Sequence, residues 1–187
     1  TPIKSSAASD VYKRQASSSV GGGAPFAYFA YNVTRTTFRF DEHGRETTNI
    51  MGPKRIPLVA GNWKMNFDHL EATYFIQQLA WNLRAVHFDY KRCEIALMPS
   101  FTSLRSVQVA VESDNLKIRY GAQAVSVTSQ GAFTGDVSAD MIAHLGCSYV
   151  IVGHSERRQY FAETDQTVNK RALAALNAGL KVCLLYT

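Results

Sequence analysis

The sequence is poor in cysteine, and its few cysteines stand far apart. Cys93, Cys147 and Cys183 are the only three in 187 residues, and no two of them form a C-x-x-C pair. The five histidines also lack metal-ligand spacing, since no two stand four residues apart as a helical zinc site requires. We therefore expect no disulfide framework and no metal site, and we expect buried, reduced thiols in a cytoplasmic protein.

Long apolar runs and dense basic segments are absent as well. No apolar stretch of the sequence approaches the roughly 18–20 residues that a membrane-spanning helix needs. The formal net charge is +5, but it is spread thinly, because six of the 20 basic and four of the 15 acidic side chains lie in residues 1–50. We therefore expect neither a membrane nor a nucleic acid as a partner.

The first fifty residues differ in kind from the rest. Their first half includes SSAASDVYKRQASSSVGGGAP, which is rich in Ser, Ala and Gly and has neither helical nor strand period. The aromatic stretch FAYFAYNVTRTTFRF that follows has the composition of a strand but no evident partner nearby. A transit peptide would be similarly Ser-rich and basic, but the acidic residues and the missing amphipathic pattern argue against it. We interpret residues 1–50 as a disordered or artefactual segment and residues 51–187 as the folded domain.

From Met51 onward, short apolar runs alternate with stretches of helical period. The runs are apolar at consecutive positions, as in strands buried on both faces. Asp68, with Glu71 three residues later, predicts a capping box, and Ser138 and Thr164 are placed to cap two further helices. The expected strands are residues 55–63, 93–99, 116–125 and 148–153, with a fifth beginning at 180–185, and the expected helices lie around residues 70–83, 104–111, 138–145 and 168–178.

This alternation predicts a parallel α/β sheet covered by helices, which is either doubly wound or closed as a barrel. Periodicity does not distinguish these two architectures. No G-x-G-x-x-G follows the first strand, which weighs against a dinucleotide-binding fold. No G-x-x-x-x-G-K-[ST] is present either, which weighs against a P-loop.

In both architectures, reactive side chains gather beyond the carboxyl ends of the strands. Asn62 and Lys64 follow the first strand, and His154 follows the fourth. Taken singly, each reads equally well as a turn or loop residue, and Arg157 and Arg158 read as surface ion-pair residues. Taken together, an amide, a cation and an imidazole at strand ends predict a site for an anionic substrate with a carbonyl group to polarise.

The position of His154 also predicts its protonation state. If a helix begins at Ser155 or Glu156, the partial positive charge of its N-terminus lies beside the imidazole. That charge disfavours the protonated ring, so we expect His154 to stay neutral near physiological pH and to donate a hydrogen bond to a carbonyl oxygen. Such an electrophile promotes enolisation only together with a separate base.

Three segments resemble those of one known family. AGNWKMN (Ala60–Asn66), GAFTGDVSADM (Gly131–Met141) and YVIVGHSERRQYF (Tyr149–Phe161) are similar, in this order and spacing, to motifs of the triosephosphate isomerases. The resemblance covers residues 54–184. It implies a TIM (β/α)8 barrel that interconverts dihydroxyacetone phosphate and glyceraldehyde 3-phosphate in glycolysis and gluconeogenesis. It also implies a cytoplasmic homodimer without a cofactor.

The matching motifs imply roles for individual residues at the strand ends. By resemblance, Asn62, Trp63 and Lys64 would bind the substrate, and Lys64 would counter the charge of the phosphate and the enediolate. His154 would be the catalytic electrophile; this family is the established example of a histidine kept neutral by a helix N-terminus.

Three further residues would support these by the same resemblance. Ser155 and Glu156 would form the surroundings of the catalytic histidine and lysine. Thr134, in the loop of residues 131–137, would reach across the dimer interface to the neighbour's asparagine and histidine.

The match to a complete barrel is partial. A full barrel needs eight strand–helix units, and residues 51–187 provide about four and a half of them. The family's catalytic glutamate, on a lid loop after strand six, and its Gly-rich phosphate-binding loops after strands seven and eight would lie beyond Thr187, and Leu185–Thr187 depart from the family pattern. We therefore expect a truncated chain with negligible activity, whose uncovered sheet edges favour aggregation.

Two alternatives stay open at this point. One is another phosphate-binding TIM-barrel or doubly wound enzyme, and a glutamate-bearing lid segment after a sixth strand would decide for the isomerase. The other is a non-catalytic protein whose basic N-terminal segment contacts nucleic acid or a membrane. Salt-sensitive binding that is lost on deleting residues 1–50 would favour that second alternative.

Overall fold

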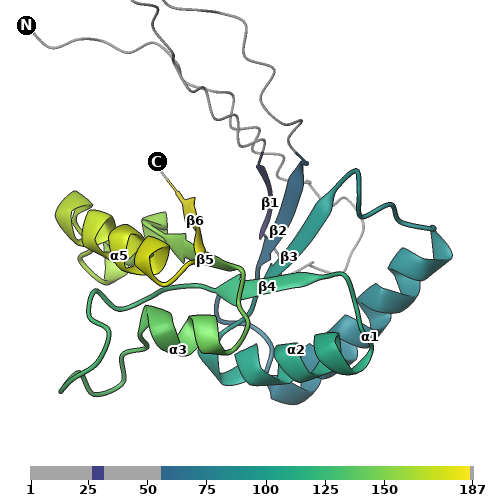
Figure 1. Cartoon of the computed structure of the whole chain (residues 1–187), viewed down its shortest axis with the longest axis horizontal. Coiled ribbons are helices and arrows are strands. Elements are labelled where there is room, and N and C mark those ends of the chain that lie inside the picture. Colours follow the sequence, from purple (N-terminus) through teal and green to yellow (C-terminus); the bar gives the residue numbers. More distant parts are fainter. Residues whose placement is uncertain (1–26, 32–55, 186–187) are drawn as a thin grey trace, which may run out of the picture.

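The structure is a computed structural model that describes residues 27–31 and 56–185 of the chain. Within these residues, six strands form one sheet whose spatial order follows the sequence (Figure 1). The strands are β1 (Ala27–Tyr31), β2 (Leu58–Asn62), β3 (Glu94–Met98), β4 (Arg119–Ala122), β5 (Tyr149–Val152) and β6 (Lys181–Leu184). The helices are α1 (His69–Ala85), α2 (Phe101–Ser113), α3 (Ala139–His144), α4 (Ser155–Tyr160) and α5 (Asp165–Asn177).

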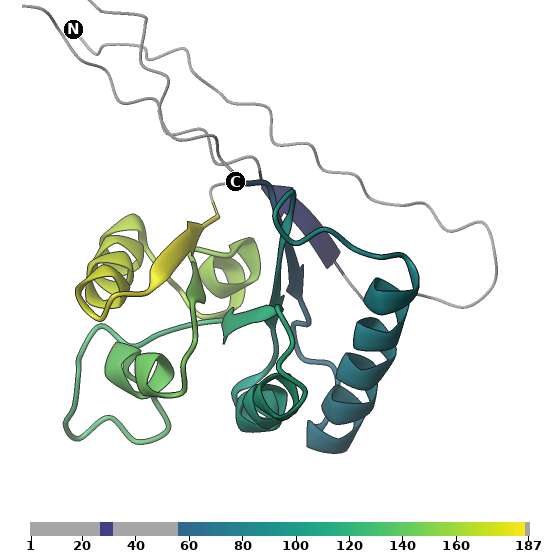
Figure 2. The ribbon, with the colours of Figure 1, turned by 45° about the vertical axis from the view of Figure 1, so that its right-hand side comes forward.

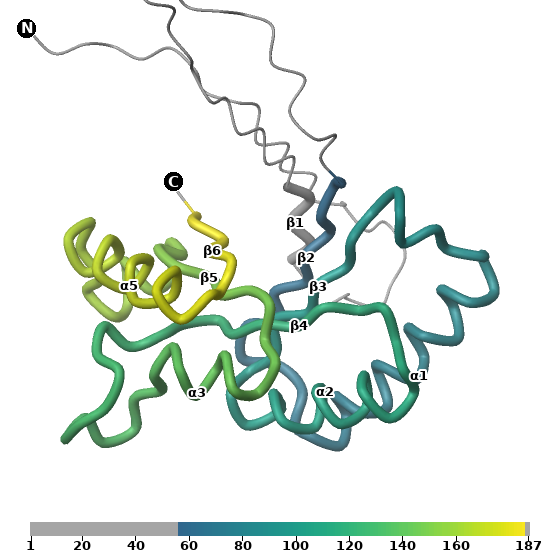
Figure 3. Tube along the Cα trace, in the orientation of Figure 1, coloured from purple at the N-terminus to yellow at the C-terminus, as the bar shows by residue number. Residues whose placement is uncertain are grey.

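Strands β2 to β6 are parallel, and each pairs with the next one along the chain. In a doubly wound sheet the strand order reverses at a switch point and helices cover both faces. Here the order does not reverse among the described strands, and Figure 2 shows α1, α2, α3 and α5 along the outer side of a curved sheet. The tube in Figure 3 follows the same path from strand to helix and back. The architecture is therefore an open part of a (β/α) barrel, which confirms the predicted fold class.

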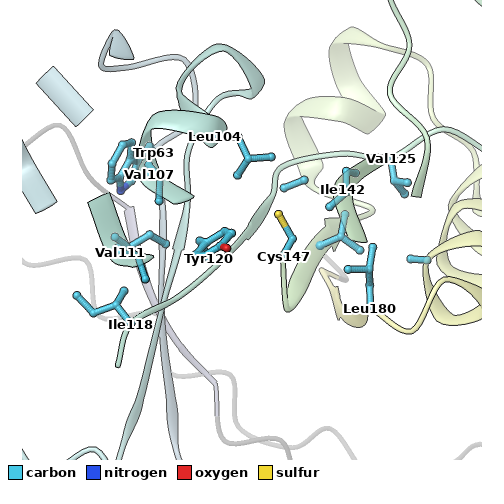
Figure 4. Packing of buried hydrophobic residues seen from close by; sticks show 14 of the residues in the cluster. Trp63, Leu104, Val107, Val111, Ile118, Tyr120, Val125, Ile142, Cys147 and Leu180 are labelled. Atoms are coloured by element: carbon cyan, nitrogen blue, oxygen red, sulfur yellow. The ribbon is translucent and has the colours of Figure 1, made fainter. Parts of the chain in front are cut away.

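The two faces of the sheet hold different cores. The face toward the helices carries the larger core, to which strands and helices both contribute, including Trp63, Leu104, Tyr120 and Ile142 (Figure 4). The opposite face carries a smaller buried cluster drawn from strands alone: Leu58, Ala60, Ala96, Met98, Tyr149 and Ile151. A cluster built only from inward-pointing strand residues is the filling of a barrel interior.

The helix ends follow the predicted local signals. The side chain of Asp68 accepts hydrogen bonds from the first turn of α1, and the Glu71 carboxylate accepts one from the Asp68 N–H at 2.9 Å, which completes the capping box. Ser138 and Thr164 cap α3 and α5 through their hydroxyl oxygens. Gly179 follows α5 with φ at 80°, a conformation that few other residues adopt readily.

Strand β1 has a partner that was not evident from the sequence. It pairs antiparallel with β2 over five residues, with Ala27 opposite Asn62 and Tyr31 opposite Leu58. The physical reason is that an edge strand presents unpaired N–H and C=O groups that an extended segment can satisfy, and sequence patterns do not show which segment will do so. Residues 1–26 and 32–50 lie outside the described residues, so the proposed domain division stays a prediction.

The cysteines depart from the prediction in one respect. Cys147 is buried, and burial raises the pKa of its thiol to about 12. Cys93 and Cys183 are only half-buried, so the expectation of burial is wrong for these two. Cys93 precedes β3, and Cys183 lies on β6, the outermost strand described at that side of the sheet. No disulfide joins the three.

None of the described helices is long and apolar enough to cross a membrane.

Candidate active site

The structure brings together the side chains predicted at the ends of β2 and β5. Asn62 is the last residue of β2, and His154 follows β5 and caps α4. The Lys64 ammonium donates a hydrogen bond to Glu156 Oε1 at 2.5 Å, an ion pair between residues 92 positions apart. Because Glu156 lies in the first turn of α4, this pair joins the two strand ends into one site.

The backbone of Lys64 is held in the left-handed region, with φ at 54°. Such a conformation in a non-glycine residue costs free energy and persists where the surroundings fix it. The Lys64 N–H donates to Asn62 Oδ1 at 3.0 Å, and its carbonyl oxygen accepts from Gln123 Nε2 at 2.8 Å. The buried Asn62 thus positions the lysine as well as lining the strand end.

Gln123 is a site residue that the sequence analysis missed. Its amide nitrogen donates to the carbonyl oxygens of both Lys64 and Met98, each at 2.8 Å, and so ties the loop after β2 to the end of β3. The sequence does contain a pattern that indicates Gln123. This residue directly follows β4, so it is a polar residue at the carboxyl end of a strand, like Asn62.

The surroundings of His154 favour the neutral state that its position predicts. The ring is buried, with 7% of the residue exposed, and Nδ1 accepts a hydrogen bond from the Glu156 N–H at 3.2 Å. An atom that accepts a bond from an N–H carries no proton, so the proton of the neutral ring sits on Nε2.

The charges around His154 act in both directions. Burial is the main cause that lowers the pKa of His154, and the Lys64 and Arg157 cations lower it further, while the Glu156 carboxylate raises it. Glu156 Oε2 lies 3.5 Å from Nδ1, a separation that would favour a protonated ring. The closer backbone N–H and the burial act against protonation, so the neutral form prevails.

Three other predicted residues lie in different surroundings. The Trp63 indole is 1% exposed and packs edge-on against Phe67 and Phe75 in the main core, and a contact of Trp63 with a substrate stays a prediction. Alternation along an extended chain explains the burial, since neighbouring side chains point to opposite faces. Ser155 begins α4 with an exposed side chain, and Thr134 is exposed in the loop of residues 131–137.

Arg157 and Arg158 form ion pairs, as predicted when each was considered singly. Arg157 Nε lies 2.6 Å from Glu163 Oε1, and Arg158 Nη1 lies 2.6 Å from Asp165 Oδ1. Glu163 is buried and also lies 3.3 Å from Arg171 Nε. These pairs fasten α4 to the start of α5, so the two arginines stabilise the segment behind His154.

The assembled groups define what chemistry the site can perform. A cation at Lys64, an amide at Asn62 and a neutral N–H donor at His154 suit an anionic substrate whose carbonyl oxygen gains negative charge. No group of three or more potential metal ligands gathers within the described ranges.

The chain matches one family model and many curated relatives. The model described as triosephosphate isomerase matches residues 57–184, more than half of the chain. The triosephosphate isomerase of Bifidobacterium adolescentis is 85% identical over 134 residues, which are 72% of this chain and 51% of that protein. The triosephosphate isomerase of Bifidobacterium longum is 72% identical over 134 residues, which are 72% of this chain and 50% of that protein. The triosephosphate isomerase of Streptomyces avermitilis is 55% identical over 126 residues, which are 67% of this chain and 48% of that protein.

The chain thus spans about half the length of the curated relatives that it matches. The matched part contains every element from β2 to β6 and both halves of the Lys64–Glu156 pair. The chain belongs to the triosephosphate isomerase family.

Proposed function

We propose that this chain provides the substrate-binding lysine and the electrophilic histidine of an enzyme that interconverts dihydroxyacetone phosphate and glyceraldehyde 3-phosphate, in glycolysis and gluconeogenesis. The observation that carries the proposal is the hydrogen bond from the Glu156 N–H to His154 Nδ1 at 3.2 Å. It leaves a neutral ring with its proton on Nε2, which is the donor that a developing enediolate oxygen needs.

In the proposed reaction, a base removes a proton from the carbon beside the substrate carbonyl, and the electrons move onto the carbonyl oxygen. His154 Nε2–H stabilises that oxygen, Lys64 offsets its charge and that of the phosphate, and Asn62 holds the lysine backbone in place. Returning the proton to the neighbouring carbon completes the isomerisation, and neither electrons nor groups are transferred to a cofactor.

The base has to come from another group. The two carboxylates nearest to His154 along the following segment, Glu156 and Glu163, are both held in ion pairs. No candidate for the base therefore stands out among the described residues around the site, and we assign that role to a residue outside them.

We further propose that the enzyme works as a homodimer in the cytoplasm. Exposed apolar side chains support a partner: Met65, next to Lys64, is 95% exposed, and Phe133, next to Thr134, is 51% exposed. Thr134, next to Phe133 and also exposed, would reach the partner's site from this loop. The enzyme would need no metal, no nucleic acid and no membrane.

A complementation experiment tests the proposal. Residues 56–184 of the chain, which leave out β1, are joined to the corresponding second half of the Bifidobacterium adolescentis enzyme, and isomerase turnover is measured. We expect activity that falls by about 100-fold or more in Lys64→Met and in His154→Gln, because each removes charge stabilisation of the transition state.

Matched controls are available on exposed positions of helices. Lys170→Met on α5 and His144→Gln on α3 change the same residue types away from the site, and both should keep full activity. Full turnover in Lys64→Met or His154→Gln would refute the proposed roles.

A further inference from the structure

The outer edge of β2 is the edge that a closed barrel needs. A strand has two hydrogen-bonding edges, and β3 occupies one of those of β2 along its whole length. In a closed eight-stranded barrel, the other edge pairs in parallel with the last strand. In this chain that edge is taken by β1, which runs antiparallel to β2 (Figure 1). The segment of residues 27–31 and a closing strand therefore exclude each other.

The pairing of β1 leaves no part of this edge open. Each of the five residues of β2 has a partner in β1, from Leu58 opposite Tyr31 to Asn62 opposite Ala27. Both strands belong to one chain, so their pairing is intramolecular, and linkage of this kind gives an effective concentration on the order of millimolar. A strand from a separate polypeptide has to compete with that concentration for the same hydrogen bonds.

The flank of α1 that faces away from α2 fits a neighbouring helix, which β1, a strand, does not provide. One flank of α1 packs beside α2, where Thr73 and Gln77 share a hollow with Arg105 and Val109. The other flank is open, and Leu70 and Tyr74 at its rim are 68% and 64% exposed. Beside these two lies a hollow of about 480 Å³, whose lining residues are Phe67, Leu70, Glu71, Tyr74, Phe75 and Gln78. In a barrel, every helix of the outer ring packs between two neighbours, so this flank fits the helix that accompanies the closing strand.

We propose that β1 holds the barrel open by occupying the strand position of its closing seam. The occupant that it excludes is the second half-barrel of a triosephosphate isomerase, which would place a parallel strand on the β2 edge and a helix on the open flank of α1. The chain spans about half of its relatives, and the other half supplies the strand and the helix that fit these two places. The inference rests on family membership and not on the proposed catalytic roles.

A cross-strand disulfide tests the position of β1 in the full chain. Ala30 and Val59 are direct partners in the register, and antiparallel partners lie within the Cα separation that a disulfide spans. We expect the double variant Ala30→Cys, Val59→Cys to form this bond on mild oxidation, as shown by peptide mapping. The single variants Ala30→Cys and Val59→Cys serve as controls. Absence of the bond in the double variant would overturn the proposal.

A binding experiment tests whether β1 competes with a closing strand for the outer edge of β2. The probe is the purified second half of the Bifidobacterium adolescentis enzyme, and sedimentation measures its binding to the chain. Phe29→Pro with Ala30→Pro removes strand donors from β1, whereas Ala7→Pro with Ala8→Pro is the matched control outside the described residues. We expect the β1 variant to bind the probe about tenfold more tightly than the wild type or the control, given the lost local competitor. The disulfide-locked chain should bind most weakly and should recover on reduction.

Two results of the sedimentation experiment would contradict the proposal. Equal binding of the probe by all of these chains would show that β1 does not compete for the seam. Self-association of the β1 variant in place of probe binding would show that a second copy of this chain, and not the second half-barrel, fits the exposed face. Neither readout depends on turnover, so failure of the proposed catalytic roles would leave both measurements interpretable.

Discussion

Lys64 and His154 are linked through a single residue, Glu156, which binds the lysine with its side chain and the histidine with its main chain. The carboxylate accepts from the Lys64 ammonium at 2.5 Å, and the N–H donates to His154 Nδ1 at 3.2 Å. The two bonds fix the cation and the imidazole relative to each other, although their strands lie far apart in the sequence.

Replacing the carboxylate in Glu156→Gln separates these two functions. The side chains of the ion pair are 36% and 41% exposed, so solvent screens it and its loss should change the free energy of unfolding by less than about 1 kcal/mol. The pKa of His154 should fall further, because the carboxylate raises it. Urea unfolding and a titration of His154 by NMR measure the two effects, with the exposed Asp114→Asn as control. A rise in the His154 pKa would contradict the assignment.

The stability of the chain should fall as the pH drops through the range set by His154. Burial lowers its pKa in the folded state below the ordinary value of about 6.5, so between the two values the unfolded chain binds more protons. The stabilisation is present above about pH 6.5 and is lost as the pH falls toward the folded-state value.

The pH effect is checked by urea unfolding at several pH values between neutral and mildly acidic. His154→Asn keeps a helix-capping oxygen and removes the titrating ring, so its stability should depend less on pH than that of the wild type. His144→Asn, on the exposed end of α3, is the control. Equal pH dependence of the wild type and His154→Asn would contradict a lowered His154 pKa.

Gln123→Ala should destabilise the chain by about 1–3 kcal/mol, because it leaves the Lys64 and Met98 carbonyls without their donor. Glycine at position 64 accepts a φ of 54° without strain, so Lys64→Gly should reduce the loss caused by Gln123→Ala. A double-mutant cycle from urea unfolding measures the coupling between the two positions. Strict additivity would show that Gln123 does not hold the lysine backbone.

Gly121→Ala should be far more damaging than Gly179→Ala. A Cβ at position 121 would lie 2.2 Å from the Tyr149 carbonyl oxygen on the paired strand β5, and backbone cannot move aside cheaply. We expect a loss of about 3 kcal/mol or more, near the upper end for overpacked sites. At position 179 nothing lies within 4 Å, so the cost is that of a positive φ alone, about 1 kcal/mol. Thermal unfolding of the two variants compares them, and equal losses would contradict the close approach of β4 and β5.

The features that the sequence predicted correctly are set by local patterns. The capping box of Asp68 and Glu71, the strand preceding His154 and the helix that begins after it all follow from residues near one another in the chain. The features that it missed depend on distant partners: β1 pairs with an edge strand, and Gln123 bonds to carbonyls of two other segments. The burial of the Trp63 indole follows from alternation, which puts it on the helix side of the sheet.

The ¹⁵N spectrum of the His154 ring at neutral pH is the most direct test of the proposed electrophile. The histidine rings are labelled selectively, and the spectrum of His144→Asn helps to assign the signals. The nitrogen chemical shifts then distinguish a protonated nitrogen from an unprotonated one. We expect a neutral ring with an unprotonated Nδ1, bonded to the Glu156 N–H, and a proton on Nε2. A cationic ring, or a neutral one with its proton on Nδ1, would contradict the proposed electrophile.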